Sequence, residues 1–199
     1  MTGFIRFNRL LVVGLVAAAA WPTAAAGHSN PRPPAVPGDI AVPAGNKAFL
    51  DGHAVGVQIH SCNATATGHA WALVAPRANL YDRRHKLIAT HFGGPTWQTK
   101  DGSKVVGARK AGVNVDPTAI DWLLLSATST TAGRLAGTTF IQRINTTGGL
   151  VPPAADCNAA TAGATKEVPY TADYVFWKAR HGGCGAVTPS APSRAGGGR

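Results

Sequence analysis

The chain has 199 residues, the length of one ordinary domain, and carries a formal net charge of +10 at pH 7. Only 14% of its residues are charged while 45% are hydrophobic, which excludes a wholly disordered protein. The 24 glycines and 14 prolines predict frequent turns, and the single glutamate, Glu167, excludes long helices laced with Glu–Lys pairs.

The N-terminal segment, residues 1–26, has the parts of a secretory signal peptide. Arg6 and Arg9 precede an apolar run over residues 10–20, and small residues then allow cleavage after about Ala26. The alternative is a transmembrane anchor, which needs about 20 apolar residues, whereas Pro22 breaks this run after about a dozen. We therefore predict a secreted or periplasmic protein with no integral membrane segment after signal cleavage.

Composition divides the remaining chain into a Pro-rich leader at residues 27–41, a single β domain at 42–179 and a Gly/Ser/Pro-rich disordered tail at 180–199. The densest basic cluster, residues 83–86, is typical of a solvated hairpin turn. A nucleic-acid binder needs a more concentrated basic face with interleaved aromatic residues, so we expect no nucleic-acid partner. A diffuse positive surface does suit weak attraction to anionic envelope polymers.

The three cysteines agree with export, because an oxidising compartment favours one bridge and one remaining thiol. Cys62 and Cys157 lie in the predicted domain and Cys184 lies in the tail. We predict a Cys62–Cys157 disulfide. A Cys157–Cys184 bridge and three reduced thiols are the alternatives.

Short apolar segments recur with turn residues between them, which is typical of an all-β protein. The predicted fold is a mostly antiparallel β-sandwich or barrel of about 8–10 short strands with at most one or two short helical turns. The candidate strands are residues 54–60, 70–74, 86–90, 96–99, 104–109, 122–127, 138–144 and 170–177.

Alternation of apolar and polar residues predicts which side chains share a face of a strand. Alternation over residues 54–60 places Val55, Val57 and Ile59 on one face of a strand, with Gln58 and His60 on the other.

Three turn signals follow along the chain. Asp101-Gly102 is typical of a tight hairpin, and Thr147-Gly148-Gly149 is expected to end a strand. Asp116-Pro117 is expected to cap a single helical turn.

Common active-site motifs are missing from the sequence. It contains no G-x-S-x-G elbow, no phosphate-binding P-loop, no H-E-x-x-H zinc helix and no G-x-G-x-x-G turn. We therefore expect no nucleotide-dependent chemistry and no cofactor. A glycosidase needs two facing carboxyl groups, and the few turn-placed aspartates suggest no such pair.

Histidines are enriched in one region: five of the seven, His53, His60, His69, His85 and His91, fall between residues 53 and 91. Such a cluster in an exported protein raises the question of copper or zinc. Its spacing is irregular, however, and we expect separate surface or hydrogen-bonded histidines and no metal site. A protein that binds metal through His91 and a second histidine is the alternative.

The segment over residues 91–98, His-Phe-Gly-Gly-Pro-Thr-Trp-Gln, is the candidate site because loops between strands present the binding sites of all-β scaffolds. If neighbouring strands pair in order, Gln58 and Trp71 come close to His91 and Trp97. An aromatic face with adjacent amide and imidazole groups suits a sugar ring or another small polar ligand. The alternative is that the tryptophans are core residues.

Five segments resemble a known family: residues 42–46, 56–62, 71–78, 93–97 and 174–179. Together they are similar to the secreted-protein family known as domain of unknown function 3455, from about Val42 to Ala179. The resemblance implies an exported single domain without an established reaction, and it supplies no catalytic residues. His91, Cys62 and Cys157 fit the family pattern, whereas His60 and His69 stand where that pattern has tyrosine.

These observations favour a non-catalytic extracytoplasmic binding or envelope-associated module. Its expected partner is a small polar ligand, a glycan or an envelope polymer, bound by His91, Trp97, Gln58 and Trp71. The alternatives are a small secreted hydrolase that uses His91, with Trp97 as a substrate platform, and the histidine-based metal-binding protein.

Overall fold

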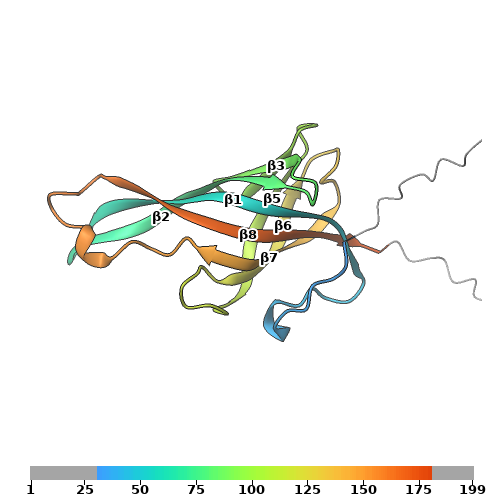
Figure 1. Cartoon of the computed structure of the whole chain (residues 1–199), viewed down its shortest axis with the longest axis horizontal. Helices are drawn as coiled ribbons and strands as arrows, with labels where there is room; N and C mark the ends of the chain where they lie inside the picture. The colour runs from blue at the N-terminus through green and yellow to red at the C-terminus, as the bar shows by residue number, and fades with distance from the viewer. Residues whose placement is uncertain (1–30, 181–199) are drawn as a thin grey trace, which may run out of the picture.

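Eight antiparallel strands pair in chain order and close into a barrel, shown in Figure 1. The computed structural model describes residues 31–180, so the predicted signal peptide, the first part of the leader and the tail with Cys184 lie outside it. The all-β, antiparallel prediction is confirmed, and the sheet is a barrel. The strands are β1 Asn46–Thr65, β2 Gly68–Tyr81, β3 Leu87–Phe92, β4 Thr96–Thr99, β5 Lys104–Val113, β6 Trp122–Thr130, β7 Thr138–Gly148 and β8 Thr165–Ala179, with 3-10 turns η1 Gly38–Ile40 and η2 Ala154–Asp156.

Three strands extend beyond the barrel and form an arm, which projects to the left in Figure 1. β1 has 20 residues, β2 has 14 and β8 has 15, so the expectation of short strands is wrong for these three. β2 pairs with β3 only from Ala78 onward, and residues 68–77 pair with β1 alone. These strands are long because each belongs to the barrel at one end and to the arm at the other.

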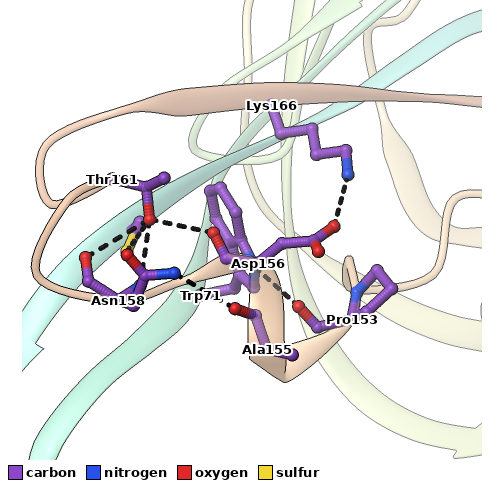
Figure 2. A network of polar contacts seen from close by, with 8 residues as sticks. Trp71, Pro153, Ala155, Asp156, Asn158, Thr161 and Lys166 are labelled. Carbon is purple, nitrogen blue, oxygen red and sulfur yellow. Dashed lines mark hydrogen bonds and ion pairs between the residues drawn. The ribbon is translucent and has the colours of Figure 1, made fainter.

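The end of the arm is fixed by a disulfide and a polar network. Cys62 on β1 is bonded to Cys157 with 5.3 Å between their Cα atoms, which confirms the predicted pairing. Figure 2 shows the loop around η2 lying against Trp71, whose indole N–H donates to the Pro153 carbonyl over 3.2 Å. Lys166 and Asp156 form an ion pair of 2.9 Å in the same network.

The barrel interior is filled by bulky side chains that face small ones. The predicted division of faces on β1 is confirmed, but the buried face is the one with Gln58 and His60, while Val55 is 50% exposed. Gly52 belongs to that inward face, where an added Cβ would come within 2.9 Å of Ile88. The main core consists of Leu50, Ala54, Ala78, Leu80, Ile88, Ala89, Trp97, Val105, Leu123, Leu125, Leu135, Ile141, Tyr170, Ala172, Tyr174 and Phe176.

A second apolar cluster lies outside the barrel, between the sheet and the segment that precedes β1. Ile40 in η1 is fully buried there with Leu124 and Trp177. The side-chain amide of Gln142 donates to the Ile40 carbonyl over 2.8 Å and accepts the indole N–H of Trp177 over 3.0 Å. The segment before β1 therefore covers the outer face of the sheet.

The predicted turns follow their sequence signals, with one correction. Gly102 adopts φ 81° between β4 and β5, and Gly148 and Gly149 adopt φ 59° and 76° where β7 ends. Asp116 caps a single hydrogen-bonded turn and no helix. Its carboxylate accepts the Thr118 N–H over 2.8 Å, and the chain then enters β6 at Trp122, which leaves no length for a helix.

No helix within residues 31–180 reaches the length and hydrophobicity that crossing a membrane requires.

The disulfide closes a loop with a sequence separation of 95, so its removal should lower stability strongly. We expect the Cys62→Ala/Cys157→Ala double variant to lose about 2–5 kcal/mol of unfolding free energy, because the unfolded chain regains the entropy of that loop. Urea unfolding followed by tryptophan fluorescence measures the loss. The single variant Cys184→Ala is the control and should match the wild type, and equal midpoints for all three proteins would contradict the prediction.

Candidate functional site

All eight strands line one cavity of about 300 Å³ at the end of the barrel from which the arm projects. Its volume is at the small end of the roughly 300–1,000 Å³ typical of ligand pockets. The wall consists of Gln58, Leu73, Val74, Ala75, Pro76, His91, Gly94, Pro95, Trp97, Arg109, Leu123, Leu125, Arg143 and Tyr174. Closure of the sheet thus brings together residues that are far apart in the sequence.

Three aromatic rings form the rigid part of the wall. His91 on β3 and Trp97 on β4 are partners in the strand register, and their rings are stacked with centroids 4.3 Å apart and an interplanar angle of 5°. Tyr174 on β8 lies with its ring centroid 5.2 Å from each of them, edge-on. His91 is only 4% exposed and Trp97 only 1%, so packing fixes both rings in place.

The hydrogen bonding of His91 determines its tautomer. Its Nδ1 lies 2.9 Å from the Thr96 carbonyl oxygen, which can only accept, so Nδ1 carries the proton. Burial lowers the pKa of His91 to about 4, and the nearby charge of Arg143 lowers this pKa as well. His91 is therefore neutral at physiological pH, and its Nε2 is a hydrogen-bond acceptor.

Two further polar groups of the wall lack a protein partner. The indole Nε1 of Trp97 is buried without a hydrogen-bond acceptor in the part of the chain that the structure describes. The side-chain amide of Gln58, a residue only 3% exposed, makes no hydrogen bond to any residue between 31 and 180. Buried polar groups are rarely left unsatisfied, and among the described residues the two such side-chain atoms are Trp97 Nε1 and His60 Nδ1. The Gln58 amide is not one of them, so on this wall it is the unpartnered group that a ligand can reach.

The polar rim of the cavity is organised around Asp121. The carboxylate of Asp121 pairs with Arg109 over 3.1 Å, and the Arg109 side chain is 59% exposed. Arg143 instead donates from Nε and Nη2 to the backbone carbonyl of Asp121, over 3.0 and 2.8 Å. The two guanidinium groups are therefore held at one side of the cavity.

The structure brings three of the four predicted site residues together. His91, Trp97 and Gln58 line the cavity, whereas Trp71 lies on the arm and packs on the η2 loop (Figure 2). Of the four tryptophans within residues 31–180, Trp97 and Trp177 are buried, as the alternative expects of core residues, and Trp71 and Trp122 are partly exposed. Sequence reasoning missed Arg143 and Tyr174, because nothing local to either residue indicates which cavity it reaches.

A larger groove of about 600 Å³ lies on the outer surface, lined by His53, His85 and part of the leader. Its polar groups bond to one another, as in the pairs of His53 with Asp173 at 2.7 Å and of Arg83 with Asp51 at 3.1 Å. We therefore favour the barrel cavity, whose polar groups are left free. Within residues 31–180 no three His, Cys, Asp or Glu side chains gather closely enough to hold a metal ion.

His91 should make stability depend on pH between about 4 and 6.5. Its pKa is near 6.5 in the unfolded chain and about 4 in the folded one, so the unfolded state binds more protons in that window. The contribution of neutral His91 to the free energy of unfolding amounts to roughly 3 kcal/mol. It is complete above pH 6.5 and is lost as the pH falls through 4. Urea unfolding at pH 7 and pH 4.5 measures the loss.

Burial lowers the pKa of His60 as well, so His60 also contributes to the pH dependence of stability. The comparison with His91→Gln separates the contribution of His91 from that of His60. The variant should lose clearly less stability on acidification than the wild type does. His85→Asn is the matched control, since His85 is exposed and its φ of 57° suits asparagine. An equal pH dependence for wild type and His91→Gln would contradict the assignment.

Comparisons with known proteins identify the family. No curated protein and no solved structure matches the chain. The model of one family, described as protein of unknown function (DUF3455), matches residues 43–178. This segment contains the whole barrel from β1 to all but the last residue of β8 and covers well over half of the chain. The chain therefore belongs to the DUF3455 family.

Proposed function

We propose that this protein is a non-catalytic extracytoplasmic binding module whose barrel cavity takes a small polar ligand. The observation that carries the proposal is the convergence of two polar groups without protein partners on one cavity, His91 Nε2 and the Gln58 amide. They offer one acceptor and one group that both donates and accepts, on a wall that packing holds rigid.

The same cavity offers little for catalysis. Its wall, as far as the described residues form it, has no serine, threonine, cysteine, lysine or carboxylate side chain to act as a nucleophile or acid. His91 is oriented by a carbonyl group, and its pKa of about 4 makes it a weak base at neutral pH. Tyr174 is buried, and burial raises its pKa, so its phenolate is inaccessible.

Ligand binding can be tested on two levels. A thermal-shift screen against small glycans, organic acids and soluble envelope polymers should give at least one ligand that raises Tm by several degrees. For that ligand, Gln58→Met should weaken binding by roughly five- to tenfold, because it removes one hydrogen-bonding group and keeps the side-chain volume. Isothermal titration calorimetry measures the change.

Trp71→Phe is the matched control, because Trp71 lies on the arm and outside the cavity. It should leave the affinity unchanged. Turnover of chromogenic esters or glycosides that disappears in His91→Ala would contradict the non-catalytic proposal and favour the hydrolase.

Export is supported by the Cys62–Cys157 disulfide, since such bonds persist in oxidising compartments. Expression in the native host should give a mature chain that begins at about Gly27 and is found in the periplasm or the medium. Intact mass spectrometry of fractionated cells measures this. An unprocessed chain in the cytosol would contradict the extracytoplasmic part of the proposal.

A further inference from the structure

The charges on the cavity wall are unbalanced. Two arginines, Arg109 and Arg143, line the cavity, and within residues 31–180 no aspartate or glutamate side chain does. The pairing of Arg109 with Asp121 places one of these positive charges next to a carboxylate at the exposed rim. The charge of Arg143 has no such neighbour, because within the same residues no carboxylate lies at ion-pair distance from it.

Arg143 is held firmly but is not neutralised. Two of its nitrogens donate to one backbone carbonyl, that of Asp121, which fixes the guanidinium plane without adding a formal negative charge. The charge acts on the cavity, since it adds to the lowering of the His91 pKa by burial and opposes the rise that burial causes in the pKa of Tyr174. A partly buried cation without a counterion is costly, and an anion bound beside it would relieve that cost.

The rest of the wall is apolar and limits what the anion can be. Leu123 and Leu125 lie within the barrel, and the arm adds Leu73 and Val74, which are 58% and 59% exposed. One uncompensated positive charge beside a mostly apolar and aromatic surface matches a singly charged ligand with an apolar body. A sugar, which presents hydroxyl groups on all sides, would leave those hydroxyls without partners against the leucines.

Resting on the binding function proposed above, we infer that the ligand is an organic carboxylate with an aromatic or branched apolar body. Its carboxylate lies against Arg143, where guanidinium groups bind carboxylates by charge-assisted hydrogen bonds. The Gln58 amide is the remaining polar partner. The apolar body contacts Leu123 and Leu125 and extends under Leu73 and Val74.

The test compares each acid with its own amide on the wild-type protein. The probes are benzoate with benzamide and 3-phenylpropionate with 3-phenylpropionamide, titrated while the amide resonances of the cavity residues are followed by NMR. Each acid should bind at least about tenfold more tightly than its amide, and the ratio should shrink as salt is raised from low to high concentration. An amide that binds as tightly as its acid would overturn the inference.

Arg143→Gln should bring the affinity for the acid down to that for the amide. Arg77→Gln is the matched control, because Arg77 forms an exposed ion pair with Glu167 and does not line the cavity. If Arg143→Gln does not fold, the acid and amide titrations of the wild type decide the question alone.

N-acetylglucosamine separates this inference from the proposal on which it rests. If the neutral sugar shifts the cavity resonances while both acids do not, the carboxylate inference fails and the binding function stands. If none of the probes perturbs the cavity, both are overturned.

Discussion

The antiparallel pairing of the first strand with the last holds this molecule together. β1 pairs with β8 from Asn46 with Ala179 to Ser61 with Thr165, so one continuous ladder both closes the barrel and forms the arm. Without it, Gln58 on β1 and Tyr174 on β8 would lie at two open edges of a sheet. Closure places them in the same cavity wall. Because the partners are more than a hundred residues apart, this ladder is entropically costly to form, and the Cys62–Cys157 bridge offsets part of that cost at its far end.

Closure also explains why β1 buries its less hydrophobic face. Trp97, Tyr174 and Phe176 are the largest fully buried side chains, and the Trp97 ring packs edge-on against the other two inside the barrel. The strands that face these rings therefore carry small residues: an added Cβ on Gly107 would come within 3.2 Å of the Trp97 ring. On β1 the inward face also has a small residue, Gly52, where Ile88 leaves no space for a side chain, and Val55 turns outward. The space left where the aromatic rings end is the cavity.

Much of this plan could be predicted from the sequence because it depends on local signals. The eight strands, the hairpin at Asp101-Gly102 and the region of His91 and Trp97 follow from alternation and turn residues. The length of β2 could not be predicted, because no local signal marks Ala78 as the residue at which β2 begins to pair with β3. Trp71 was placed near the site on the assumption of pairing in order. The order is correct, but β2 pairs with β3 only from Ala78 onward, and Trp71 lies in the preceding arm segment, opposite Cys62.

The unpaired polar groups of the wall support the proposal that the cavity binds a ligand. A protein interior normally pairs its buried polar groups, and an apolar substitution at Gln58 or a carboxylate near Arg143 would satisfy that rule. This chain instead leaves the Gln58 amide and the Arg143 charge without protein partners on one wall and buries the unpaired N–H of Trp97 beside them, at a cost to its stability. On the outer side of the sheet the same sequence pairs its buried polar groups, as the bonds from Gln142 to Ile40 and from Trp177 to Gln142 demonstrate, whereas Nδ1 of His60 on β1 is a second buried atom without a partner among the described residues. Such a local exception in a well-packed fold is expected where a ligand supplies the missing partners.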